Sequence, residues 1–375
     1  MKSWRVIVGL LISAGFLIFA FRGQDFGRIR DALGEVNYWY LVPALALYFA
    51  GVGVRAFRWS VLLRPVVRMG TRETLPIVAV GFMANNVLPL RTGEIVRAYV
   101  LGRRHGVRKT AALATIAVER LFDGLTLLCF ILAATTVVSF TSELQHLTIV
   151  AFILFAAVLI GLFLLTFGGS LRDRLLQIVL GPMPAPMADR VERMAESVLS
   201  GLGVLTRKTD LVIVAGASVL AWLFEASMYW AMARGFGGDL AESLGIAGTL
   251  LTTGVANLAT LIPSSPGYVG PFEYGVSLVV NGALDVAKPV ALSYAIVVHA
   301  ALYFPITFWG MFEWWRQHLS LRQVRAAEAE VQLQNGNGAA SPAEARPVVG
   351  GTPVLAEPGV QPVQQQMTRR GARRR

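Results

Sequence analysis

The decapeptide Asn85-Asn86-Val87-Leu88-Pro89-Leu90-Arg91-Thr92-Gly93-Glu94 interrupts a strongly apolar part of the chain, directly after the run 76–83. Its proline and glycine break helices, and its arginine and glutamate cost about 2.5–3.5 kcal/mol each at membrane depth on insertion scales. Irregular backbone at that depth is tolerated only inside protein or beside a water-filled cavity. Breaks of this kind in apolar segments also mark the substrate sites of transporters. The decapeptide therefore predicts a broken membrane segment at a functional site.

The composition indicates a polytopic membrane protein, because 55% of the 375 residues are hydrophobic and only 15% are charged. Apolar runs long enough to cross about 30 Å lie at 4–21, 39–62, 111–140, 147–168, 211–234 and 288–314. Two further runs, 76–90 and 244–262, end in polar breaks that contain Gly and Pro, and shorter apolar pieces follow at 95–101 and 268–284. We therefore expect an all-α fold with about eight hydrophobic segments.

The distribution of Lys and Arg predicts the topology. Segments 63–75, 91–110 and 169–210 are basic, whereas 141–147, 235–245 and 263–287 contain no Lys or Arg. By the positive-inside rule the first set is cytoplasmic and the second external, and the loop 22–38 also falls outside. Segments 76–101 and 244–287 then each return to the side they entered from, as re-entrant hairpins or as pairs of full spans. The halves 1–145 and 146–315 become inverted repeats, each with a broken helix pair, in a multi-pass plasma-membrane protein with both termini cytoplasmic.

A short internal match supports the repeat. Pro89-x-x-x-Gly93 in the first broken segment has the same spacing as Pro263-x-x-x-Gly267 in the second. Both pairs stand at the predicted tips of the broken segments, which gives the match weight that two residues alone would lack.

The residues at the two tips suggest an anion site. Thr92 can cap the helix that returns from the first tip, and Ser264 or Ser265 can cap the helix after the second. A helix N-terminus inside the membrane presents unpaired N–H groups and a positive dipole end, and Arg91 adds a planar fork suited to phosphate. The alternative is that these residues only cap and pair with one another.

The third span carries Glu119, Arg120 and Asp123. At a rise of 1.5 Å per residue, Glu119 would lie about 12 Å along this helix, inside the hydrocarbon region. Asp123 can contact both neighbours on one helix face. The group has one excess negative charge, which Arg91 or Arg97 could balance. It belongs either to the substrate path or to a purely structural contact between helices.

Other ionisable residues stand singly in apolar spans. Glu225 and His299 are candidates for proton coupling, although a lone His is more often structural. Glu273 follows the second tip. Arg55 and Arg58 fall near the end of the second span, and we expect them to snorkel to the cytoplasmic interface.

The remaining sequence excludes other classes of protein. A net charge of +11 would suit a nucleic-acid partner, but Lys and Arg lie mainly in the short loops, so we expect none. No P-loop, dinucleotide fingerprint, zinc spacing or nucleophile elbow is present, so we expect no cofactor, metal or catalytic residue. The tail 316–375 becomes rich in Gly, Ala, Pro and Gln and ends in clustered Arg, which predicts a cytoplasmic, mostly disordered segment.

Three motifs in this order resemble the membrane domain of lysylphosphatidylglycerol synthases: Asn86-x-x-Pro89-x-Arg91-x-Gly93-Glu94-x-x-Arg97, Glu119-Arg120-x-x-Asp123, and Pro263-x-Ser265-Pro266-Gly267-x-x-Gly270-x-x-Glu273. The resemblance covers about residues 4–315. In that family the membrane domain moves an aminoacylated phospholipid between leaflets, and a separate soluble domain makes that lipid. No counterpart of the soluble domain follows here, so the resemblance implies a stand-alone, flippase-like domain over residues 1–315.

The resulting hypothesis is a transporter that moves a phosphate-bearing or aminoacylated lipid headgroup while the acyl tails stay in the bilayer. Its partner would be an anionic or aminoacylated phospholipid or an isoprenoid lipid, and a lipid-biosynthetic enzyme is a further candidate. Arg97 would gather anionic lipid on the cytoplasmic side. The rivals are a membrane-embedded subunit or enzyme of a polyprenyl-, glyco- or hopanoid-lipid pathway and, third, a proton symporter for small solutes. The candidate substrate-binding residues are Asn86, Arg91, Thr92, Gly93, Glu94, Arg97, Glu119, Arg120, Asp123, Ser264, Ser265, Gly267 and Glu273.

Overall fold

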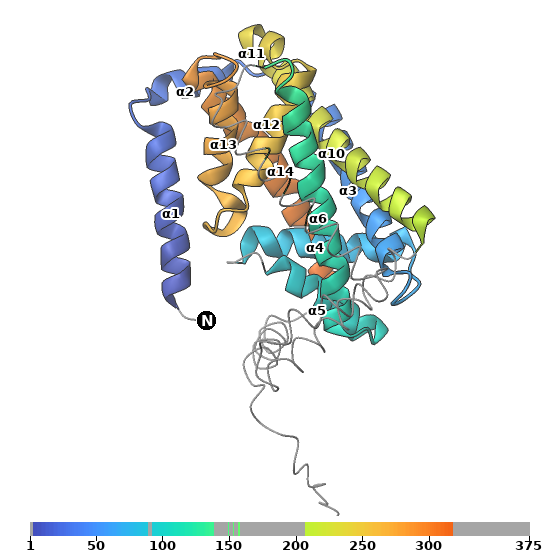
Figure 1. The fold of residues 1–375 in the computed structure, drawn as a ribbon. Coiled ribbons are helices and arrows are strands. Elements are labelled where there is room, and N and C mark those ends of the chain that lie inside the picture. The colour runs from blue at the N-terminus through green and yellow to red at the C-terminus, as the bar shows by residue number, and fades with distance from the viewer. Residues whose placement is uncertain are drawn as a thin grey trace, which may run out of the picture. The chain divides into compact units, whose positions relative to one another are not determined.

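The computed structural model describes residues 3–88, 92–138 and 207–317, together with the single positions 149, 153 and 157. The chain divides into two units, 1–336 and 337–375, and every described residue belongs to the first. All regular elements of the described ranges are helices (Figure 1). Arg91, most of the predicted span 147–168 and most of the tail lie outside the described residues. The predicted all-α, polytopic fold class is confirmed.

Three helices are long and apolar enough to cross a membrane: α3 (Leu41–Leu63, extended to Tyr38 by the short helix η1, Tyr38–Tyr40), α10 (Lys208–Phe236) and α14 (Lys288–Arg316). Helices α1 (Ser3–Phe21) and α2 (Phe26–Gly34) meet at a bend of 84°, and together they are long and apolar enough to count as a fourth, broken span. Helix α6 (Lys109–Ala134) is also 26 residues long, but it carries three charged side chains in its middle. These helices match the spans predicted at 39–62, 211–234, 288–314, 4–21 and 111–140.

Helix α2 lies in the predicted loop 22–38. Asp25 caps it, since its Oδ1 accepts from the backbone N–H of Gly27 at 2.8 Å. Ile29 packs against Leu292 of α14, and the hydroxyl of Ser293 donates to the Ile29 carbonyl at 3.1 Å. A hydropathy criterion overlooks this helix because only one face of it is apolar.

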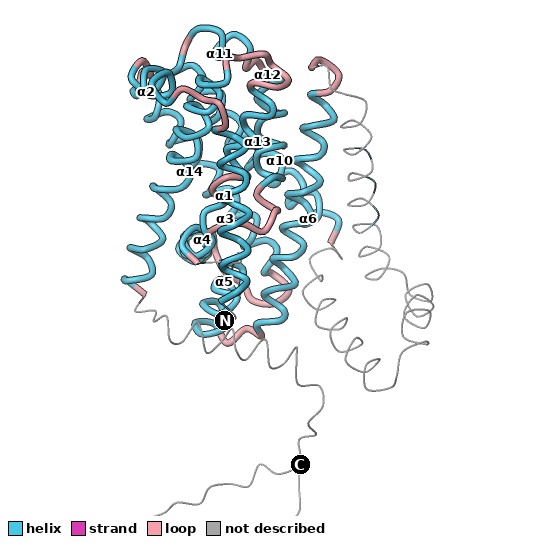
Figure 2. The backbone as a smooth tube through the Cα atoms, turned by 90° about the vertical axis from the view of Figure 1, so that its left-hand side faces the viewer, coloured by secondary structure: helices cyan, strands magenta, loops and turns pink. Residues whose placement is uncertain are grey.

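Both predicted broken segments are helix pairs. The first consists of α4 (Thr71–Val87) and α5 (Gly93–His105), and the second of α12 (Ile246–Ala259), the short helix η4 (Pro266–Tyr268) and α13 (Pro271–Val280). Helix α11 (Gly238–Ser243) precedes the second pair. Figure 1 shows α4 lying across the direction of the long helices, and in Figure 2 it is viewed end-on. This crosswise course favours a hairpin over two parallel full spans.

The tips of the two broken segments meet beside α14. The side-chain amide of Asn86 at the end of α4 donates to the hydroxyl of Thr307 at 2.8 Å, and the hydroxyl of Tyr303 donates to the Asn86 carbonyl at 3.3 Å. On the second tip, a Cβ added to Gly267 would lie 3.5 Å from the same carbonyl oxygen. Asn86 and Gly267 are 181 positions apart in the chain, about half its length, and thus share one contact region.

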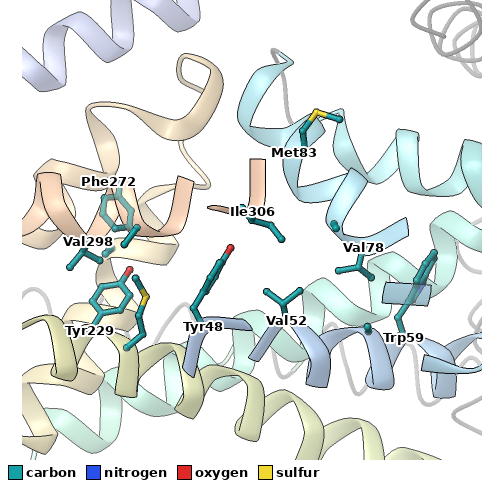
Figure 3. Close-up of a cluster of buried hydrophobic side chains, with 14 of the residues drawn as sticks. Tyr48, Val52, Trp59, Val78, Met83, Tyr229, Phe272, Val298 and Ile306 are labelled. Carbon is teal, nitrogen blue, oxygen red and sulfur yellow. The ribbon is translucent and has the colours of Figure 1, made fainter. Parts of the chain in front are cut away.

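The apolar core joins the long helices to the second tip. Figure 3 shows Tyr48 and Trp59 of α3, Tyr229 of α10, Phe272 of α13 and Ile306 of α14 in one buried cluster. Aromatic side chains bury about 150–250 Å² each and so dominate such a core. The core fixes the separation of α3, α10 and α14, and this separation determines the position of the charged groups described next.

Candidate functional site

A cavity of about 680 Å³ lies where the two tips face the long helices. Apolar side chains such as Phe82, Leu127 and Ile306 make up much of its wall. Its ionisable residues come from elements that are far apart in the sequence: Arg55 of α3, Glu94 of α5, Arg120 and Asp123 of α6, Glu225 of α10 and His299 of α14. Several of the predicted site residues therefore do line one space.

The carboxylate of Asp123 is held mainly by Arg58. The guanidinium of Arg58 donates to the two oxygens of Asp123 at 2.6 and 3.2 Å, and its Nη1 also donates to the hydroxyl of Ser218 at 2.7 Å. The indole N–H of Trp222 donates to Asp123 at 2.9 Å. Arg58 is completely buried. The expectation that Arg58 snorkels to the interface was wrong, because the two partners on other helices hold it inside the bundle.

Glu119 is the second centre of this ion network. Arg97 donates to both of its oxygens at 3.0 and 2.9 Å, Arg120 contacts it at 2.6 Å, and Arg58 approaches to 3.4 Å. Arg120 also reaches Asp123 at 3.5 Å, so the predicted contact between Asp123 and Arg120 on one helix face is present. The predicted balancing of the excess acid by Arg97 is confirmed as well.

Arg97 does not lie at the cytoplasmic surface, where we expected it to gather lipid. Its side chain is buried, and its guanidinium stacks over the ring of Trp59 at 4.1 Å from the centroid. It does not line the cavity, and neither does Glu119. Glu119 contacts the cavity wall through Arg120, and Arg97 in turn contacts Glu119.

Arg55 and Glu225 form a second buried pair. Their side chains meet at 2.7 Å, and the Arg55 guanidinium lies 4.7 Å from the ring centroid of Trp222. The expectation that Arg55 snorkels to the interface was therefore also wrong. Glu225 does not stand alone in its span, because it is paired with Arg55. Within the described residues, the network and the cavity wall together bring four arginines (Arg55, Arg58, Arg97, Arg120) near four carboxylates (Glu94, Glu119, Asp123, Glu225).

At the first tip the protein satisfies part of the helix end itself. The backbone N–H of Gly93 donates to the side-chain oxygen of Asn85 at 2.8 Å, and the amide of Asn85 lies 3.4 Å from the Glu94 carboxylate. Thr92 makes no capping hydrogen bond, contrary to expectation, and its buried hydroxyl has no partner among the described atoms. Glu94 in the first turn of α5 compensates the positive end of the helix dipole.

The second tip is organised by Glu273 rather than by the serines. Helix α13 starts only at Pro271, and the carboxylate of Glu273 accepts from the backbone N–H of Gly270 at 2.6 Å. The predicted caps Ser264 and Ser265 precede η4 instead, and neither makes a side-chain capping bond. The ring of His299 lies 2.5 Å from Glu273. Each returning helix thus carries a carboxylate in its first turn, which weakens an anion site made by the helix ends alone.

Several residues of this site were not among the predicted site residues. Arg55 and Arg58 hold acids on two other helices, α10 and α6, and Tyr48, Asn257 and Tyr303 add polar groups to the cavity wall. The spacing of Arg55 and Arg58, one helical turn apart in an apolar span, was the available signal, because acids in other spans require cations at the same depth. Within the described residues no group of three His, Cys, Asp or Glu could hold a metal ion.

Comparison with known proteins places this arrangement in a family. A "UPF0104 membrane protein" of Methanothermobacter thermautotrophicus is 27% identical over 323 residues, covering 82% of this chain and 92% of the relative. The "Glycosyltransferase AglD" of Haloferax volcanii is 24% identical over 335 residues, covering 79% of this chain but only 51% of the relative. The family model for the lysylphosphatidylglycerol synthase TM region matches residues 6–310. The chain belongs to the lysylphosphatidylglycerol synthase transmembrane-region family, a group of multi-pass membrane proteins with a lipid-related role.

Proposed function

We propose that this protein moves the polar headgroup of a membrane lipid between the two leaflets, with the acyl chains remaining in the bilayer. The observation that carries the proposal is the cavity of about 680 Å³ at the junction of the two hairpin tips. It lies among helices that are long and apolar enough to cross a membrane, so it offers polar contacts where lipid offers none. Sites between repeats built from broken helices are the usual substrate sites of transporters.

The charges of the wall suit a headgroup that carries both signs. Arg55 and Arg120 can attract a phosphate, and Glu94, Asp123 and Glu225 can attract an amine. All of these side chains except Glu94 are ion-paired within the described residues. When a headgroup binds, these side chains would exchange their present partners for the charged groups of the headgroup. Such an exchange lowers the desolvation cost of bringing charges into the bilayer. A phosphate-bearing or aminoacylated headgroup meets these conditions.

The apolar part of the wall fits the same substrate. Phe82, Leu127, Leu258 and Ile306 interleave with the polar groups, as in other ligand sites, where a few polar residues are set in an apolar lining. A purely ionic solute would have no use for this surface, whereas the glycerol and first acyl carbons of a lipid would. We place the protein in the plasma membrane with both termini cytoplasmic, on the strength of the positive-inside pattern.

A second candidate function has one observation in its favour. The archaeal relative whose name describes a glycosyltransferase shares 335 aligned residues with this chain. A membrane-embedded subunit or enzyme of a glycolipid pathway would use the carboxylates Glu94, Asp123 or Glu225 as acid or base. That alternative requires a chemically altered lipid, whereas transport leaves the lipid unchanged.

The test uses matched substitutions in one helix. Ala117 and Ala133 are both exposed residues of α6, but only Ala117 lines the cavity. The purified full chain would be reconstituted in vesicles of defined composition with fluorescent phospholipids of anionic, zwitterionic and aminoacylated headgroup, and leaflet exchange would be followed by chemical quenching.

Ala117→Phe should slow leaflet exchange by roughly tenfold or more, the effect of losing about 1.4 kcal/mol of binding in the path, while Ala133→Phe leaves the rate unchanged. Equal rates in the wild type and in protein-free vesicles for every headgroup would refute transport. Appearance of a new lipid species by mass spectrometry would favour the enzymatic alternative.

A further inference from the structure

His299 lies between two hydrogen-bond acceptors. Its Nδ1 is 2.5 Å from a carboxylate oxygen of Glu273, and its Nε2 is 2.7 Å from the backbone carbonyl of Gly267. Both partners belong to the second tip, while His299 belongs to α14. The ring therefore connects a long transmembrane helix to both sides of the tip loop.

For both contacts to be hydrogen bonds, His299 and Glu273 together need one more proton than a neutral imidazole and an ionised carboxylate carry. A neutral imidazole has a single N–H and can donate to only one of the two acceptors. Both bonds form when His299 is an imidazolium, or when the proton sits on Glu273 and the ring donates only to Gly267. In either case the pair holds the extra proton. Without it, a ring nitrogen lone pair faces an oxygen, and one of the two contacts must break.

The loop that the pair holds has an unfavourable backbone. Gly267, Tyr268 and Gly270 all have positive φ values, of 75°, 62° and 102°. For Tyr268 this is a region that residues with a Cβ rarely adopt. The loop is fixed on its other side by the N–H of Ser265, which donates to the hydroxyl of Ser13 in α1 at 2.8 Å. Contacts with neighbouring helices, not local preference, keep the tip in this conformation.

The tip also forms part of the cavity wall. Tyr268 and Phe272 line it together with His299 itself, and the Phe272 and His299 rings lie 4.5 Å apart. A movement of the loop between them would change access to the cavity. The pair is thus placed to control the entrance of the space described above.

We propose that His299 and Glu273 form a proton-binding site that closes the second tip over the cavity, and that loss of the proton frees the tip. When the pair releases its proton to water, the ring keeps one N–H, and either the Gly267 or the Glu273 contact is lost. This inference deepens the proposed transport function by naming the proton as the ion that gates it.

The other ionisable groups around the pair do not provide the same connection. Tyr303 of α14 lies edge-on to the ring at 6.2 Å, and Tyr268 of the tip lines the same cavity. The same cavity is also lined by Tyr48 and Arg55 of α3, Glu94 of α5, Arg120 and Asp123 of α6, and Glu225 of α10. Arg55 and Glu225 neutralise each other at 2.7 Å. Among these groups in the described residues, only Glu273 contacts His299 directly and also caps the tip helix.

The test measures opening of the tip without any lipid movement. Ser264 is suited to a reporter cysteine, because its buried hydroxyl has no hydrogen-bond partner in the described structure, so Ser264→Cys sacrifices no contact. The exposed native thiol would be removed by Cys129→Ala. The full chain in detergent would be labelled with a water-soluble maleimide from about pH 5 to about pH 9, the range in which a histidine site can titrate. Leu261→Cys, which is 52% exposed, corrects for the pH dependence of thiol reactivity.

The labelling ratio of Ser264→Cys to Leu261→Cys should rise with pH by roughly tenfold, the change expected when one hydrogen bond to a charged group is lost. His299→Gln cannot bridge the two acceptors, so the ratio should be high at every pH. Glu273→Gln should do the opposite. Its amide can donate to a neutral ring while its oxygen keeps the Gly270 N–H, so the ratio should stay low at every pH.

The opposite directions of the two variants separate a proton site from a general loss of structure. A ratio independent of pH in the unsubstituted protein would overturn the proposal, and so would a tip that Glu273→Gln opens as much as His299→Gln does. Because the readout is thiol labelling, a negative result here leaves the transport test untouched, and absence of transport leaves this test interpretable.

Discussion

Replacing Arg58 with Met is the most direct test of the ion network. The Arg58 side chain has no exposed surface, and it donates to Asp123 at 2.6 and 3.2 Å and to Ser218 at 2.7 Å. Met has similar length and no charge, so it fills the space but leaves Asp123 with one cation fewer. Removing one partner of a buried ion pair typically costs about 3–5 kcal/mol.

The neighbouring arginines reduce this cost but do not cancel it. Arg120 is 3.5 Å from Asp123, and its side chain remains 34% exposed, so water already screens it. We therefore expect a loss of about 3 kcal/mol for Arg58→Met, the lower end of the range for buried pairs. Arg120→Met, the matched control, should cost about 1 kcal/mol or less, as for partly exposed pairs.

The assay is thermal unfolding of the purified protein in one detergent, followed by tryptophan fluorescence. A loss of about 3 kcal/mol corresponds to a fall in Tm of roughly 5–10 °C. The double variant Arg58→Met with Asp123→Asn should recover at least half of that fall, because the stranded carboxylate is then neutral. The reasoning is refuted if Arg58→Met lowers Tm no more than Arg120→Met, or if the double variant is less stable than Arg58→Met alone.

Three further predictions address the tips and the topology. Gly93→Ala should lower Tm by more than 5 °C, roughly the effect of 2–3 kcal/mol, because the new Cβ would overlap a backbone carbonyl oxygen of α4. Gly53→Ala is the control, since a Cβ added to Gly53 would have nothing within 4 Å. Equal Tm values for the two variants would contradict the close packing of the hairpin. Arg91→Lys and Arg91→Ala should both slow lipid movement at unchanged Tm if Arg91 holds phosphate through its planar fork, whereas rescue by Lys of a destabilised Ala variant would make Arg91 structural. Single cysteines in 235–245 should react with an impermeant thiol reagent from outside and those in 169–210 should not, and reaction of the latter would exclude the inverted repeat.

Most of the fold could be predicted because hydropathy and helix breakers act locally. The spans at 39–62, 211–234 and 288–314 became α3, α10 and α14 within two or three residues at each end. The breaks after 76–90 and 244–262 became the junctions between α4 and α5 and between α12 and α13, whereas Pro76 and Pro305 lie inside α4 and α14 without ending them. Helix α2 was missed because its apolar face appears only when 3.6-residue periodicity, and not mean hydropathy, is considered.

The partners of the charged residues could not be predicted in the same way. The position of Arg58 near the end of a span allows either snorkelling or burial, and the choice depends on Asp123 and Ser218, which lie 65 and 160 residues away in the chain. Within one helix, the contact of Arg120 with Asp123, three residues further along, followed from spacing alone. Contacts within a helix can be predicted from the spacing of residues in the sequence. Contacts between helices depend on how the helices pack, which a single sequence does not show.

The two tips satisfy their helix ends by different means, and this difference matters for function. In the first, a neutral amide of Asn85 accepts from Gly93, and no proton is needed to keep that contact. In the second, Glu273 caps Gly270 and also contacts the ring of His299, and that contact needs a proton on one of the two groups. If the two halves are inverted repeats, the same fold thus carries a fixed hairpin on one side and a proton-sensitive hairpin on the other. Alternating access requires that a shared cavity open to only one side at a time. A second tip that depends on a bound proton would allow the protonation state to bias that choice, because a ligand shifts an equilibrium toward the conformation it binds better.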